Sequence, residues 1–98
     1  MLPVDALSPL DGRYASQLVD VSSAFSEAAL IRARVRVEVE WLICLASDSA
    51  ISGITPFTTV EMASLREIVS QFNGTDAERV KAIETRTRHD VKAVEYYL

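Results

Sequence analysis

The sequence is poor in the residues that most often build reactive or metal-binding centres. It contains one cysteine, one histidine and three glycines. With Cys44 as its single cysteine, the chain cannot form an internal disulfide, which fits a reducing cytoplasm. The apolar neighbours Leu42, Ile43 and Leu45 predict that this thiol is buried. A lone histidine and a lone cysteine far apart in sequence are poor material for a metal site, so no metal is expected. Three scattered glycines match neither nucleotide-binding fingerprint, and no cofactor is expected.

Long apolar runs are also absent. No stretch approaches the length of a membrane-spanning helix, and the first residues lack the cationic start and apolar core of a signal peptide. We therefore expect a cytoplasmic protein with no membrane partner. The net charge of −4 argues against nucleic acid as a partner, because a phosphate backbone requires a basic face. Ninety-eight residues, 49% hydrophobic and 24% charged, fit one small globular domain.

Residues 1–20 are expected to form an extended or turning arm. Two prolines and Gly12 oppose a regular helix there. Gly12 is expected to let the backbone bend, so that Arg13 and Tyr14 project in a fixed direction. The competing interpretation is a surface tail, which is a common fate of chain ends.

The longest predicted helix runs from Ser22 or Ser26 to about Ala50, a stretch without glycine or proline. Residues 34–41 alternate polar and apolar, which is typical of a half-buried strand. The absence of breakers, the Ala- and Leu-rich ends and a wide apolar face favour a helix instead. The predicted face comprises Leu30, Ile31, Val35, Val37, Trp41, Leu42, Leu45 and Ala46.

Charged side chains accompany this helix in opposite pairs one turn apart, Arg34 with Glu38 and Arg36 with Glu40. We interpret them as a solvated face, with a partner surface as the alternative.

Capping signals and apolar stripes predict further short helices, giving an all-α chain of about four helices behind an extended N-terminal arm. Ser52 and Gly53 are expected to end the long helix, and Asn73 with Gly74 to end the next one. The predicted capping boxes are Thr58 with Glu61 and Thr75 with Glu78, and the apolar stripes are Met62, Leu65, Val69 and Phe72, with Ile68 at the edge, then Val80 and Ile83.

The last helix is predicted to begin near Arg88. Thr87 followed three residues later by Asp90 has the form of a capping box. Val91, Val94 and Leu98 then recur at helical spacing and predict a buried stripe.

The only histidine, His89, would then lie in the first turn of this helix. Unpaired backbone N–H groups and the positive end of the helix dipole attract anions there, and Arg86 and Arg88 flank the position. The same residues are common as plain capping or surface residues, which is the competing interpretation.

Two segments carry a resemblance to a known family. Thr-Arg-His-Asp-Val-Lys-Ala-Val-Glu-Tyr, residues 87–96, resembles the His-Asp segment of the adenylosuccinate lyase family, within the fumarase/aspartase superfamily. Ser-Pro-Leu-Asp-Gly-Arg-Tyr, residues 8–14, resembles the N-terminal substrate loop of that family, and the helix from Phe25 to Leu42 is similar too. The resemblance covers essentially the whole chain.

This resemblance implies a cytoplasmic, homotetrameric C–N lyase of purine biosynthesis. It implies elimination of fumarate from adenylosuccinate to give AMP, and the same cleavage of the succinylated aminoimidazole carboxamide ribotide. Matched motif by motif, Arg13, Tyr14, Arg88, His89 and Asp90 would bind the substrate, and His89 could assist proton transfer. Some family members have Asn at the position of Arg88.

Other parts of the family pattern do not occur in this sequence. The flexible loop Gly-Ser-Ser-x-Met-Pro, which carries the catalytic serine, is missing, as are a second histidine and the long helical bundle of the tetramer. We therefore expect residues 1–98 to be an N-terminal domain, with an arm at 1–20 and a helical part at 22–98, truncated before that bundle. Such a fragment would supply substrate-binding residues only and be inactive alone.

Two other interpretations remain at this point. One is a non-catalytic helical interaction module, and the other is a different superfamily member such as an argininosuccinate lyase. The pair of motifs Asp-Gly-Arg-Tyr and Arg-His-Asp favours the purine branch.

Overall fold

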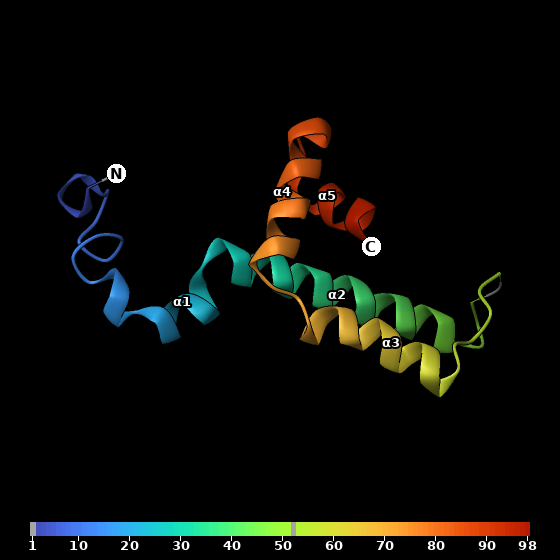
Figure 1. The fold of residues 1–98 in the computed structure, drawn as a ribbon. Helices are drawn as coiled ribbons and strands as arrows, with labels where there is room; N and C mark the ends of the chain where they lie inside the picture. The colour runs from blue at the N-terminus through green and yellow to red at the C-terminus, as the bar shows by residue number, and fades with distance from the viewer. Residues whose placement is uncertain (1, 52) are drawn as a thin grey trace. The chain divides into compact units, whose positions relative to one another are not determined.

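The computed structural model describes residues 2–51 and 53–98, and every regular element within these ranges is helical (Figure 1). The all-α prediction is confirmed. Five α-helices are present where about four were expected, because residues 19–25 form a helix of their own. The elements are two short 3-10 helices, Pro3–Asp5 and Ala15–Gln17, followed by α1 (Val19–Phe25), α2 (Glu27–Ser47), α3 (Thr59–Ser70), α4 (Gly74–Thr87) and α5 (Asp90–Tyr97).

The chain divides into two compact units, Met1–Leu30 and Ile31–Leu98. In the first unit the arm turns repeatedly, as predicted, with the Tyr14 N–H donating to the Pro9 carbonyl at 2.9 Å. Ser26 separates α1 from α2, since its backbone is extended and its hydroxyl accepts the Ala29 N–H at 3.2 Å. A serine that caps a helix in this way gives α2 its start one residue later.

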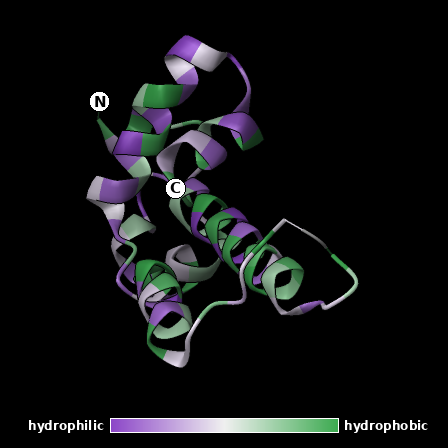
Figure 2. Cartoon of the chain, turned by 90° about the vertical axis from the view of Figure 1, so that its right-hand side faces the viewer, coloured by the Kyte–Doolittle hydropathy of each residue, from purple (hydrophilic) through white to green (hydrophobic). Residues whose placement is uncertain are grey.

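The core of the second unit is built on one face of α2. Residues spaced four apart along that helix are buried, and half-buried residues of α3 pack against them. Figure 2 shows hydrophobic and hydrophilic residues interleaved along the helices, as expected of amphipathic helices. The buried cluster comprises Ile31, Val35, Val39, Ile43, Ala77, Val80, Ala93 and Val94.

The predicted face of α2 was partly wrong. Ile31, Val35 and Ala46 are buried as expected, but Val37 is 65% exposed and Trp41 is 57% exposed. The α2 helix carries apolar residues on two opposite sides, and the neighbouring helices cover only the side that contains Val39. Periodicity alone does not tell which of two apolar faces a helix buries.

Cys44 is exposed, so the prediction of a buried thiol was wrong. Its neighbour Ile43 faces the core, and consecutive residues of a helix point in different directions. The α2 helix ends at Ser47, where the Asp48 carboxylate accepts the Ala50 N–H at 2.8 Å and forms a turn. Of the predicted stop, Ser52 lies outside the described residues, and Gly53 follows the helix end by several residues with a left-handed φ of 90°.

The predicted capping box of α3 is confirmed. The Glu61 N–H donates to the Thr58 hydroxyl at 3.1 Å, and the Thr58 N–H donates to the Glu61 carboxylate at 2.9 Å. The stripe of Met62, Leu65, Val69 and Phe72 is half-buried against the core, also as predicted.

The boundary between α3 and α4 differs from the prediction. The α3 helix already ends at Ser70, and Asn73 starts the next helix rather than stopping this one. Its backbone is extended, and its side chain forms a reciprocal capping box with Asp76. The predicted box of Thr75 with Glu78 was therefore wrong: asparagine is as good an N-cap as threonine and lies two residues earlier.

The α5 helix packs on α4 through Val94, as predicted, and through Ala93, but the rest of the predicted stripe is not buried. Ala93 and Val94 are fully buried, whereas Val91 and Leu98 are 37% and 48% exposed. The Tyr97 ring also meets Phe72 edge to face, with ring centroids 5.7 Å apart. These contacts hold α5 against α4 and against Phe72.

Candidate functional site

The junction between α4 and α5 is a two-residue turn. Arg88 is the C-cap of α4 and adopts a left-handed backbone, with φ 52° and ψ 31°. Among the described residues it is the only one other than glycine with a positive φ. Its N–H donates to the Glu84 carbonyl at 2.7 Å, which ends α4 while the side chain remains exposed. The turn brings Arg88, His89 and Asp90 together at the surface.

His89 is the N-cap of α5, not a residue of its first turn. Its Nδ1 atom accepts the Lys92 backbone N–H at 3.2 Å. A ring nitrogen accepts a hydrogen bond only when it carries no proton, so this bond requires the tautomer whose proton is on Nε2. The imidazole is 64% exposed, and Nε2–H is the atom that can donate to a ligand.

The predicted capping box of Thr87 with Asp90 was therefore wrong. Thr87 is the last residue of α4, and its hydroxyl donates to the His89 carbonyl at 3.1 Å. It also accepts the His89 N–H at 3.3 Å. The threonine braces the turn while the histidine caps the helix.

Asp90 is the first residue of α5 and is held on two sides. One carboxylate oxygen accepts the Val91 N–H at 2.9 Å, and the other lies 2.9 Å from the Arg34 guanidinium on α2. The Val91 hydrogen bond and then the charge of Arg34 hold the pKa of Asp90 below its ordinary value of 3.8. Asp90 therefore remains a carboxylate at neutral pH.

These bonds change how an anion could bind at this end of α5. Unpaired backbone N–H groups in the first turn were expected to attract an anion, but the N–H groups of Val91 and Lys92 already have side-chain acceptors. Donation to a ligand therefore falls to the side chains, the Arg88 guanidinium and His89 Nε2–H.

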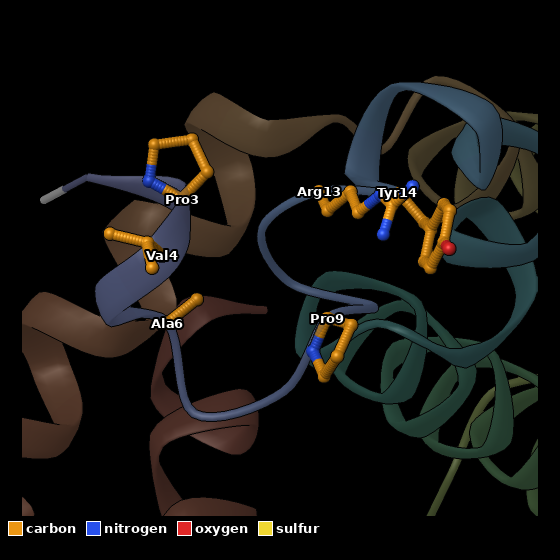
Figure 3. Close-up of a pocket in the computed structure, with 6 residues that line it drawn as sticks. All are labelled: Pro3, Val4, Ala6, Pro9, Arg13 and Tyr14. Carbon is orange, nitrogen blue, oxygen red and sulfur yellow. The ribbon is translucent and has the colours of Figure 1, made fainter.

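The second group of predicted site residues lies on the arm. The Arg13 guanidinium stacks over the Tyr14 ring, 5.0 Å from its centroid. The two border a shallow hollow of about 310 Å³, with the short helix at Pro3–Asp5 across from them (Figure 3). The hollow is lined by Pro3, Val4, Ala6, Pro9, Arg13 and Tyr14.

Gly12 lies within the turns of the arm, as expected, and it also allows two segments to approach closely. A Cβ atom at this position would lie 2.2 Å from the Pro3 carbonyl oxygen, so any other residue would push the two segments apart. The glycine therefore permits the close contact between Pro3 and the turn that precedes Arg13.

Arg13 and Tyr14 belong to the first unit, and Arg88, His89 and Asp90 belong to the second. The structure gathers the residues within each group. The meeting of the two groups at one substrate remains a prediction.

Sequence reasoning missed Arg34 as a neighbour of this site. Its spacing predicted a pair with Glu38, and Arg36 was paired with Glu40. The structure pairs Arg34 with Asp90 and Glu40 with Arg66, which donates two hydrogen bonds to it at 2.9 and 3.1 Å. Contacts between separate helices leave no local spacing in the sequence, so no signal there indicates them.

Residues 2–51 and 53–98 contain no group of three or more His, Cys, Asp and Glu side chains able to hold a metal ion. Over the same ranges, no helix combines the length and apolar character needed to cross a membrane. The fold and its polar clusters define a helical protein that presents Arg, His and Asp side chains at a helix junction.

Comparison with known proteins identifies the family. No protein-family model matches the chain. An adenylosuccinate lyase of Haemophilus influenzae is 53% identical over 93 residues, and one of Escherichia coli K12 is 46% identical over 93. One of Dictyostelium discoideum is 45% identical over 97 residues. Each match covers 95% of this chain and 20% of the relative.

The chain belongs to the adenylosuccinate lyase family, which confirms the resemblance seen in its sequence. It spans about a fifth of the length of these curated relatives.

Proposed function

We propose that this chain supplies substrate-binding residues to an adenylosuccinate lyase. The observation that carries the proposal is 41–53% identity to proteins of that name over at least 95% of the chain. The reaction would release fumarate from adenylosuccinate to give AMP, with the same C–N cleavage on the succinylated aminoimidazole carboxamide ribotide. Both reactions serve purine biosynthesis.

The proposed roles follow from the chemistry of the substrate, which carries a phosphate and two carboxylates. Arg13 would hold one of these anions through its forked donors, with the Tyr14 hydroxyl beside it. Arg88 and the Nε2–H of His89 would donate to a second anion. Asp90 accepts rather than donates, so we assign it to orienting the start of α5.

The elimination needs a base that removes a proton beside a carboxylate and an acid that protonates the departing nitrogen. As His89 Nδ1 is committed to capping α5, only Nε2 is available for exchange with substrate. We assign His89 to binding first and to proton transfer second. The main acid and base would come from segments beyond these 98 residues, with the enzyme acting as a cytoplasmic homotetramer.

Substitution of the proposed contacts tests this assignment. In the complete enzyme, Arg13→Ala and His89→Ala should each lower kcat/KM about ten- to a hundredfold, the range for loss of one or two charge-assisted hydrogen bonds. Fumarate release is the measurement. Arg36→Ala, which removes an exposed guanidinium of α2, is the matched control and should stay within twofold.

Unchanged rates for both Arg13→Ala and His89→Ala would contradict the proposal. They would favour a helical interaction module whose polar residues only cap helices and brace turns.

Residues 1–98 alone should not convert adenylosuccinate, because the chain lacks the family's serine loop. The measurement is fumarate release by the purified chain against a buffer blank, with the complete enzyme as positive control. Turnover above the blank would show that these residues contain the reacting groups after all.

A further inference from the structure

We propose that Arg34 is a positioning residue for the site at the α4–α5 junction. By pairing with Asp90, it keeps His89 as a neutral imidazole whose Nε2–H faces the ligand. This inference rests on the proposed function for its effect on turnover, while its effect on the imidazole can be measured without substrate.

The contacts form a short chain from α2 to the imidazole. Arg34 Nη1 lies 2.9 Å from Asp90 Oδ2, and the other oxygen, Oδ1, lies 3.8 Å from His89 Nδ1. That same Nδ1 accepts the Lys92 N–H at 3.2 Å. Two states of the ring therefore compete. Unprotonated Nδ1 caps α5, whereas protonated Nδ1 would become a donor and turn toward Asp90.

Arg34 decides between these states by neutralising the carboxylate. A neighbouring negative charge favours the protonated imidazolium, and a guanidinium paired to that charge weakens the effect. Of the other charged groups near the ring, the Lys92 ammonium is paired with Glu95 at 2.9 Å, and Arg88 points its side chain into solvent. Arg34 is thus the cation that directly offsets Asp90.

The exposure of the Arg34–Asp90 pair fits a role in orienting His89 better than a role in stabilising the fold. The Arg34 and Asp90 side chains are 30% and 50% exposed, and ion pairs this exposed contribute little to the free energy of unfolding. The Arg66–Glu40 pair has the same 2.9 Å distance and a similarly exposed carboxylate, although its arginine is more exposed at 55%, and neither residue contacts His89. It provides a matched control for the loss of an inter-helix ion pair.

The first experiment measures the ring in the 98-residue chain. His89 is the only histidine, so its ¹⁵N imidazole signals are unambiguous. At pH 7 the parent chain should show an unprotonated Nδ1 and a protonated Nε2. Arg34→Gln should move the Nδ1 signal toward the protonated position and weaken the protection of the Lys92 amide against exchange. Arg34→Lys, which keeps the charge, should restore the parent signals, and Arg66→Gln should leave them unchanged.

The second experiment measures turnover in the complete enzyme. Arg34→Gln should lower kcat/KM about tenfold and alter its pH profile, since a misplaced contact group commonly costs that much or more. Arg34→Lys should recover most of the loss, and Arg66→Gln should stay within twofold.

The outcomes separate the two proposals. An unchanged imidazole signal in Arg34→Gln would overturn the positioning role, whatever the kinetics show. Full activity in Arg34→Gln with strong loss in His89→Ala would also overturn it.

Full activity in His89→Ala with a shifted ring signal in Arg34→Gln would instead reject the substrate-binding role of His89 and leave the positioning contact intact. Should Arg34→Gln fail to fold, Arg34→Lys still decides, because displaced His89 signals in that variant would contradict the charge argument.

Discussion

Arg88 combines an unfavourable backbone with a proposed functional side chain. A left-handed conformation is disfavoured for any residue with a Cβ, and asparagine and glycine tolerate it best. This accounts for the asparagine that some family members have at this position. Arginine at position 88 places a positive charge next to His89, although its left-handed backbone conformation is strained.

Replacing Arg88 by glycine should therefore raise stability and lower function. We expect the free energy of unfolding of the chain to rise by about 1 kcal/mol, because glycine relieves the strain at a left-handed helix end. Urea unfolding followed by circular dichroism measures this change. In the complete enzyme the same variant should lose substrate affinity, seen as a raised KM.

Arg86→Gly is the control, since Arg86 lies in the last helical turn of α4 two residues earlier. Glycine inside a helix should destabilise by about 1 kcal/mol, opposite in sign to the expected effect at Arg88. Destabilisation by both variants would mean that the Arg88 backbone is not strained.

The α2 helix shows what periodicity can and cannot decide about an element. Its charges, its lack of breakers and its apolar residues predicted a helix against the competing strand, and the helix is present. The choice of buried face was beyond the pattern, because Val35, Val37 and Val39 alternate with charged residues and all look alike in sequence. Packing by the neighbouring helices buries Val35 and Val39 and leaves Val37 in solvent.

A pair of valine substitutions tests this face. Val39→Ala should lower the free energy of unfolding by about 2 kcal/mol, since it removes two buried methyl groups and leaves a cavity. Val37→Ala, on the same helix but 65% exposed, should change it by less than about 0.5 kcal/mol. Thermal or urea unfolding provides both values. Equal losses at the two positions would show that both faces of α2 are covered in solution.

Capping signals alone did not decide every helix boundary. The box of Thr58 with Glu61 was predicted from its spacing, and both reciprocal bonds form. Asn73 was assigned to the wrong helix because asparagine suits either end, as a cap before a helix or as a left-handed stop after one. Its extended backbone, set by the short turn from α3, decides for the first role.

At the scale of the whole chain, folding gives several carboxylates hydrogen bonds that stabilise their charged form. The folded pKa lies below the ordinary value for three carboxyl groups, each of which accepts a hydrogen bond that favours its charged form. They are Glu40 with the Arg66 side chain, Glu61 with the Thr58 backbone, and Asp90 with the Val91 backbone.

The free energy of unfolding should consequently fall in acid. A folded pKa below the unfolded one means that the stabilisation is fully present above the unfolded values of 4.5 for Glu and 3.8 for Asp. It is lost as the pH falls from there through the folded values. Urea unfolding between pH 7 and pH 2 should show this decline, and Glu40→Gln should make it shallower.

Glu67→Gln removes the same charge from an exposed position of α3 and is the control. It should leave the acid dependence closer to that of the parent chain. A decline equally shallow in both variants would indicate a general effect of net charge instead of the Arg66 contact.

The sequence by itself determined the helical class, the turning arm, the cap at Thr58 and the family, because local spacing and short motifs carry that information along the chain. Only the tertiary structure decided which face of α2 is buried, that Cys44 is exposed, and that Arg34 reaches Asp90. Those facts depend on which helices pack together. Packing brings together residues that are far apart in sequence, so local sequence patterns do not predict which of them come into contact.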